Sequence, residues 1–146
     1  MQKASEGVAV VATIDPDVHT AAAYTSDWVP VKNFNQFMAV VMAGTLGSSA
    51  TLDAKIQQAT SNAGASAKDI SGKAITQLTE AGTDSDKQAI INVLADDVDV
   101  ANGFNHIAVV MTVGTATSDA GAAIFGLAPR FGPANDYDLA SVDEIV

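Results

Sequence analysis

Two histidines and the carboxylates near them are the residues of this sequence best suited to chemistry. His19 follows Asp15 and Asp17, and imidazole and carboxylate groups bind divalent cations when three or more of them converge. A turn at Asp15-Pro16-Asp17 with an exposed histidine beside it explains the same residues without a ligand. We therefore predict no metal site and no cofactor.

The second histidine, His106, lies across a tight turn from Asp99, and an aspartate that orients a histidine is the centre of a catalytic triad. A structural hydrogen bond beside an apolar strand is the commoner role for such a histidine. The neighbouring Asp96 and Asp97 offer carboxylates for acid–base catalysis, but a run of acids also suits a charged strand edge. Walker, GxSxG and HExxH patterns do not occur. We predict that the protein is not an enzyme and has no catalytic residues.

Four side chains are better candidates for an interface, namely Trp28, Arg130, Phe131 and Tyr137. Aromatic residues and arginine are the types that most often anchor protein–protein contacts. Trp28 is the only tryptophan, and a lone indole beside a proline is more often such an anchor than a platform for sugars. The other three interrupt an acidic, proline-broken segment, which we expect to dock on a neighbouring subunit. A disordered solubilising tail is the alternative that its composition allows.

The composition narrows the functions further. A chain of 146 residues fits one domain that folds without disulfides, and cysteine is absent. The 17 acidic and 7 basic side chains give a net charge of −10, which repels phosphates and anionic headgroups, so we predict no nucleic-acid or membrane partner. Apolar runs stay below the roughly 18 residues that span a bilayer, and the first residues do not resemble a secretory signal. We expect synthesis in the cytoplasm.

Alternation of apolar and polar residues predicts about eight short strands and no long amphipathic helix. In residues 51–59, one set faces the core and the other faces solvent: Leu52, Ala54 and Ile56 against Asp53, Lys55 and Gln57. We expect this strand to pair with residues 34–46 through a loop at Gly47-Ser48-Ser49. Residues 87–100 fit a helix as well, but a strand is favoured because Asn102-Gly103 predicts a hairpin with residues 104–115.

One apolar segment occurs twice, as FNQFMAVVMAGT at 34–45 and as FNHIAVVMTVGT at 104–115. The two copies suit equivalent places in two facing sheets, although β-strands also resemble one another by chance. We expect Val41 and either Val109 or Val110 to be buried. Both faces of the first copy are apolar, since Met38, Val40 and Met42 alternate with core residues. A loop, an arm or another subunit must cover the second face.

These patterns predict an all-β fold, an antiparallel β-sandwich that is jelly-roll-like, with extended N- and C-terminal arms. Residues 1–146 form a single domain with a core at about 8–128 and arms at 1–7 and 129–146. On this interpretation a chain that ends at Ala128 still folds.

The stretch VVMAGTLGSSATLDAKIQQATSNAG at 40–64 resembles small virion proteins of tailed double-stranded DNA bacteriophages. In that group a strand ending in Gly-Thr or Gly-Ala precedes a strand of the type xLxxKIQQA and a small polar loop. Residues 73–100 and 127–146 are similar to the same group, so the resemblance extends from about residue 8 to the end.

The resemblance implies a capsid decoration, or cement, protein on the outer surface of the virion. Its partners would be the major capsid protein and further copies of itself, as a homotrimer, and the family offers no catalytic residues. A head-to-tail connector or tail component of the virion is the main alternative. A carbohydrate-binding module is the second alternative, although aromatic residues make up only 5% of the chain.

Overall fold

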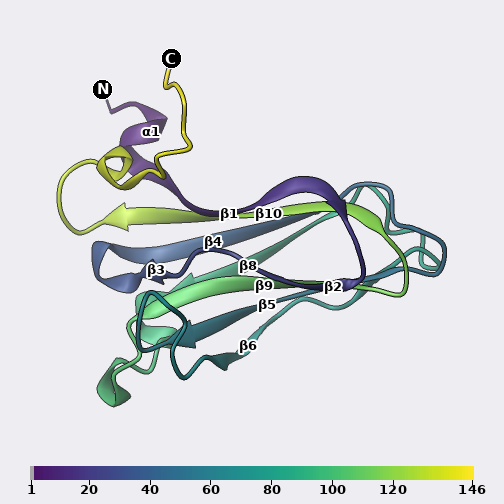
Figure 1. The fold of residues 1–146 in the computed structure, drawn as a ribbon. Coiled ribbons are helices and arrows are strands. Elements are labelled where there is room, and N and C mark those ends of the chain that lie inside the picture. Colours follow the sequence, from purple (N-terminus) through teal and green to yellow (C-terminus); the bar gives the residue numbers. More distant parts are fainter. Residues whose placement is uncertain (1) are drawn as a thin grey trace.

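The computed structural model describes residues 2–146, which form two antiparallel sheets packed face to face (Figure 1). Sheet A has the strand order β1-β10-β4-β8, and sheet B has the order β2-β9-β5-β6, with β3 beside β9 and β7 beside β5. Successive long strands mostly alternate between the sheets, which is the jelly-roll arrangement. The predicted fold class is confirmed.

The strands of sheet A are β1 (Val8–His19), β10 (Ser118–Pro129), β4 (Phe34–Ala43) and β8 (Gln88–Leu94). Those of sheet B are β2 (Ala22–Thr25), β3 (Val29–Pro30), β9 (His106–Gly114), β5 (Thr51–Ala59), β6 (Lys68–Ala74) and β7 (Leu78–Thr79). One helical turn, α1 (Ala4–Gly7), precedes β1. The connections contain the 3₁₀ turns η1 (Val31–Asn33), η2 (Ala95–Asp97), η3 (Val100–Asn102) and η4 (Ala134–Tyr137).

The repeated segment lies at the centre of both sheets. Its first copy is β4, between β10 and β8, and its second copy is β9, between β2 and β5. Val41 and Val109 are completely buried and Val110 nearly so, as predicted. The alternation expected for residues 51–59 is also present, because Leu52, Ala54 and Ile56 all belong to the core of β5.

Both predicted hairpins are wrong. β4 pairs with β10 and β8, whereas β5 pairs with β9, β6 and β7, so Gly47-Ser48-Ser49 lies in a link between the sheets. Asn102 ends η3 and Gly103 takes the left-handed conformation after it, with φ of +87°. This turn connects β8 in sheet A to β9 in sheet B. The turn residues are correctly located, but a turn signal does not determine whether the flanking strands pair with each other.

The turn predicted at Asp15-Pro16-Asp17 is also wrong. β1 continues to His19, and its register against β10 shifts between Ile14 and Asp17. This irregularity accommodates a proline that cannot donate a ladder hydrogen bond. Gly121 on β10 makes room for it, because a Cβ at Gly121 would lie 2.9 Å from the Cα of Pro16.

The C-terminal segment lies against its own chain. Ala134 is fully buried, and the Tyr137 ring meets the Phe34 ring edge-on with centroids 5.4 Å apart. The Leu139 amide donates to the Val10 carbonyl at 2.9 Å, and the Val10 amide donates to the Asp138 carboxylate at 2.7 Å. These contacts cover part of the free edge of β1. The segment expected to reach for a neighbour is therefore held mainly by its own sandwich.

Candidate functional site

The outward side of sheet A is apolar across all four strands. The pairing registers align its side chains in rows, such as Ile90–Val40–Ala123–Thr13. Apart from Asp119 on β10 and the exposed Asp15 and Asp17 on the irregular end of β1, the residues that point outward are uncharged, and most are apolar: Val8, Val10, Thr13, Gln36, Met38, Val40, Met42, Gln88, Ile90, Asn92, Leu94, Gly121, Ala123, Phe125 and Leu127. We call this surface the A face.

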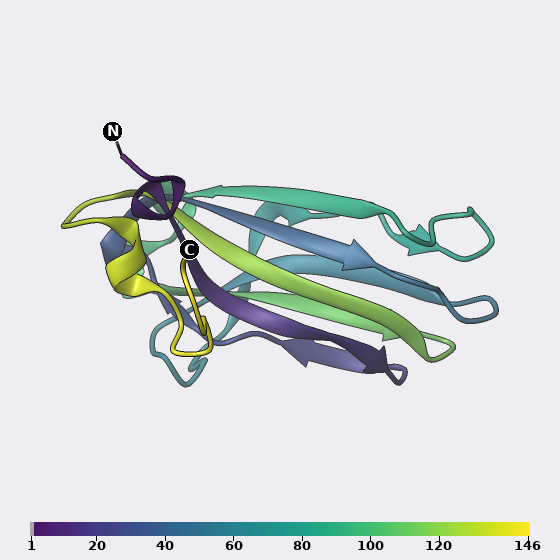
Figure 2. The ribbon, with the colours of Figure 1, turned by 90° about the horizontal axis from the view of Figure 1, so that it is seen from above.

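The A face is open to solvent over most of its area. Ile90 is 58% exposed, Met42 is 54% exposed and Leu94 is 50% exposed. Figure 2, which looks down on sheet A, shows β8, β4, β10 and β1 side by side, with the C-terminal segment crossing only one end. Soluble monomers rarely expose a contiguous apolar patch larger than a few hundred Å². The A face is therefore the candidate site for docking.

The outward side of sheet B has the opposite character. Lys55 on β5 pairs with Asp69 on β6 at 2.9 Å, and the Gln57 amide donates to the same carboxylate at 2.8 Å. On the same strand, Asp53 accepts a hydrogen bond from the Gln77 amide at 2.7 Å. Polar side chains bonded to one another are typical of a sheet side that faces water. The two sides of the sandwich thus differ, and only sheet A lacks this polar cover.

A groove runs along β10 on the A face. Its floor is made of the small residues Gly121 and Ala123, and its walls are Met42 and Val40 on β4 and Pro16 on β1. Pro16 is so close that no side chain larger than hydrogen fits at Gly121, so the irregular stretch of β1 helps to shape the groove. Methionine adapts its shape to a partner more readily than branched residues do. The groove suits an apolar side chain inserted from outside.

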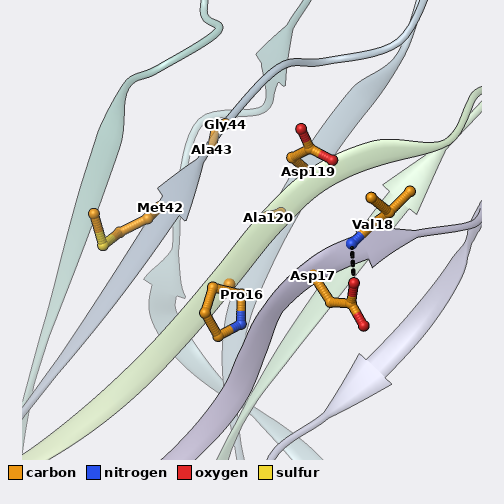
Figure 3. Close-up of a pocket in the computed structure, with 9 residues that line it drawn as sticks. Pro16, Asp17, Val18, Met42, Ala43, Gly44, Asp119 and Ala120 are labelled. Atoms are coloured by element: carbon orange, nitrogen blue, oxygen red, sulfur yellow. Dashed lines mark hydrogen bonds between the residues drawn. The ribbon is translucent and has the colours of Figure 1, made fainter.

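Carboxylates border one end of this groove (Figure 3). Asp17 on β1 and Asp119 on β10 lie on neighbouring strands and line one pocket with Met42 and Gly44, and both are exposed. The Asp17 carboxylate accepts a hydrogen bond from the Val18 amide at 2.7 Å. The A face therefore combines an uncharged centre with an acidic border at this end.

The two histidines weighed for chemistry are engaged in local structure. A ring nitrogen of His19 bonds the Asp15 carbonyl at 2.9 Å, and the ring packs on Tyr24 with centroids 4.4 Å apart. His106 bonds the Asn105 side chain instead of Asp99, whose carboxylate pairs with Lys68 at 2.9 Å. Within residues 2–146, no group of three or more histidine, aspartate or glutamate side chains is arranged to hold a metal ion.

None of the four predicted interface residues belongs to the A face. Trp28 packs on Gly64, where an added Cβ would lie 2.5 Å from the indole nitrogen. The Tyr137 hydroxyl donates to the Phe131 carbonyl at 3.1 Å, while the Phe131 ring is 67% exposed. Arg130 is exposed beside a cavity described below. Their role in an interface stays a prediction.

The residues of the A face were not among those predicted as a site. A signal for them was present, because Met38, Val40 and Met42 gave the first copy of the repeat a second apolar face. The contributions of β8 and β10 could not be found this way, since the register that places Ile90 and Phe125 beside β4 is long-range.

Comparisons with known proteins find similar structures but no matching protein family. No protein-family model matches the chain, and no curated protein matches it. Several solved structures are similar at low identity. A chain of infectious bursal disease virus strain Gx is 9% identical, with a TM-score of 0.42 over 88% of this chain and 33% of that chain. A chain of Broad Bean Stain Virus is 16% identical, with a TM-score of 0.38 over 80% and 62%.

The third is a chain of an empty virus-like particle of Cowpea Mosaic Virus, 10% identical, with a TM-score of 0.37 over 91% of this chain and 89% of that chain. The chain thus spans about a third of the first of these proteins and under two thirds of the second. No helix in residues 2–146 is long and apolar enough to cross a membrane.

Proposed function

We propose that this protein is a structural component of a virus particle, which docks through the A face onto the outer surface of a phage capsid and reinforces it. The observation that carries the proposal is the open, largely apolar face across β1, β10, β4 and β8. Jelly rolls serve as viral capsid, lectin and cupin domains, and the fold is compatible with this role. The sequence resemblance to small virion proteins points the same way.

The size of the A face suits a specific interface. β4 has 10 residues, so at about 3.4 Å per residue and about 4.8 Å between strands the four-stranded sheet measures roughly 34 by 19 Å. The flat area of this sheet is about 650 Å², without the additional surface that protruding side chains give. It approaches the roughly 800 Å² that each partner buries in a standard interface. Burial of this surface is favourable because apolar area leaves water.

The charge at its border favours a partner other than a second copy. Asp17 and Asp119 border one end of the groove, and Asp15 is exposed on the same stretch of β1. The whole chain carries a net charge of −10, so two copies meeting face to face would bring like charges together. A shell protein with an apolar knob and a basic border would complement the A face. The negative charge also suits a surface turned away from packaged DNA.

Analysis of purified virus particles from the source tests this role. We expect the protein to be present in a number of copies comparable to the number of shell subunits, and to be labelled by antibody on intact particles before genome release. A single ring of copies would support the connector alternative instead. Absence from washed particles would reject a virion role altogether. The homotrimer implied by the resemblance is checked separately, by sedimentation of the purified protein.

A further inference from the structure

The cationic side chains of this acidic protein fall into two groups. Four of the seven are paired with aspartates at 2.8–3.1 Å: Lys55, Lys68, Lys73 and Lys87. Within residues 2–146 the other three, Lys3, Lys32 and Arg130, form no ion pair. Lys3 lies in the N-terminal segment, whereas Lys32 and Arg130 line the same cavity. Two unpaired cations at one place are unexpected in a chain with so many unpaired acids.

This cavity lies outside the A face and has a volume of about 590 Å³. Backbone hydrogen bonds hold its walls together, since the Val31 amide donates to the Asn105 carbonyl at 3.0 Å and the Arg130 amide donates to the Asn33 carbonyl at 2.9 Å. The backbone at Lys32 is therefore held on both sides. The residue before it bonds to the segment that leads into β9, and the residue after it bonds to the residue that follows β10. The remaining lining is mixed and comprises Pro30, Ala95, Asp96, Val100 and His106.

The electrostatics of the cavity favour an incoming anion. Burial, and then the positive charge of Lys32, lower the pKa of His106 below 6.5, so the ring is neutral at pH 7. The Asn105 Oδ1 accepts a hydrogen bond from Nδ1 of the ring, so Nε2 of the neutral ring is an acceptor and donates to a carboxylate only when the ring is protonated. Asp96 is the one carboxylate on the lining, and it forms no ion pair with Lys32 or Arg130. Arginine and lysine without a counter-ion bind carboxylates through charge-assisted hydrogen bonds.

We propose that this cavity binds the carboxylate side chains of an acidic peptide segment, and that residues 143–146 of a second copy supply them. These residues are Asp143, Glu144, Ile145 and Val146, and all four are exposed. The last backbone hydrogen bond in the connections of the chain joins Val142 to Leu139, so the segment beyond it is free to be bound. It offers two carboxylates followed by aliphatic side chains.

The cavity matches that pattern. Beside Lys32 and Arg130 it presents the 57% exposed Val100, which suits an aliphatic side chain next to a carboxylate. Figure 1 shows the C-terminus above sheet A, pointing away from the sandwich, while β3 at the cavity lies below that sheet. The contact therefore joins two copies head to tail. It does not depend on the A face or on the proposed role in a virus particle.

Sedimentation of the full-length protein at two salt concentrations tests this contact. We expect weak self-association that declines as salt rises, because it rests on charge. Association through an apolar face would instead persist or strengthen with a kosmotropic salt, so the two surfaces are distinguishable. Lys32→Gln together with Arg130→Gln is expected to weaken association about ten- to hundred-fold, as expected for lost hydrogen bonds to charged groups. Lys3→Gln, which removes an unpaired cation elsewhere, should change nothing, and Asp96→Asn should strengthen the association.

A charge exchange gives the decisive outcome. A K32E/R130E variant and a D143K/E144K variant should each remain monomeric, because cavity and segment then carry the same charge. Mixing the two should restore association through two complementary contacts. The unchanged segment of the first variant fits the unchanged cavity of the second, and the lysines of the second fit the glutamate-bearing cavity of the first. NMR titration should also show a higher pKa for His106 in the wild-type complex than in the monomer. A wild-type protein that stays monomeric at low salt, or a mixture that does not associate, would overturn the proposal.

Discussion

Replacing Gly126 with alanine is expected to destabilise the sandwich through one aromatic ring. A Cβ at this position would lie 2.6–2.8 Å from three ring atoms of Phe34. Carbon atoms in contact are about 3.5–4.0 Å apart, so the ring would have to retreat by roughly 1 Å. It has little space to do so. Phe34 is 1% exposed, and its ring lies between Phe37 and Tyr137, with centroids at 5.8 and 5.4 Å.

Overpacking of this kind costs about 1–3 kcal/mol. The stabilisation of about 0.4–1 kcal/mol that alanine brings by restricting the unfolded chain is smaller. For a chain of this length we expect the melting temperature to fall by roughly 2–8 °C, measured by circular dichroism or calorimetry. Gly7→Ala is the matched control, because nothing lies within 4 Å of a Cβ there. A Gly126→Ala protein that melts with or above the wild type would refute the packing described around Phe34.

Three further predictions concern other parts of the fold. Gly64→Ala should destabilise the protein and red-shift its tryptophan fluorescence, because Gly64 has φ of +75° and its Cβ would displace the Trp28 indole; unchanged emission would contradict this contact. A chain ending at Ala128 should unfold more readily than the full chain in denaturant, since it loses the buried Ala134 and the ring packed on Phe34; equal midpoints would show that the last segment adds no stability. A hydrogen bond from the Leu94 amide, and then Lys73, lower the pKa of Asp97 below 3.8. The contribution of ionised Asp97 to the free energy of unfolding is therefore present above pH 3.8 and is lost as the pH falls through the folded-state pKa. Asp97→Asn should flatten the acid side of the plot of stability against pH.

The sequence predicts the composition of the core better than the connections between strands. Buried positions such as Val41 and Val109 were predicted because alternation of apolar residues is a local property. The pairing of β5 with β9 was not predicted, because in a jelly roll most links between strands cross from one sheet to the other. A Gly-Ser or Asn-Gly turn lowers the free-energy cost of reversing the chain, whether the two flanking strands pair in one sheet or lie in different sheets. Only the contact between distant strands decides between them.

The candidate site shows the same limit. The second apolar side of β4 was visible in the sequence, and so was the need to cover it. The exposed Ile90 on β8 and the groove over Gly121 depend on strands far apart in the chain, as does the cavity that brings Lys32 and Arg130 together. Arg130 was predicted as an interface residue, but Lys32 stands in no motif, and only the ion pairs of the folded chain separate it from the other lysines.

Cosedimentation of an A-face variant with particles stripped of this protein tests the central claim most directly. Ile90 is 58% exposed, so Ile90→Asp should leave the melting temperature nearly unchanged while placing a charge in the docking surface. We expect it to bind at least about ten-fold more weakly than the wild type, which corresponds to about 1.4 kcal/mol. Ala23→Asp, which adds the same charge at an exposed position of β2 in sheet B, should bind like the wild type. If Ile90→Asp binds as tightly as the wild type, the A face is not the docking surface; loss of binding by Ala23→Asp alone would place the docking surface on sheet B.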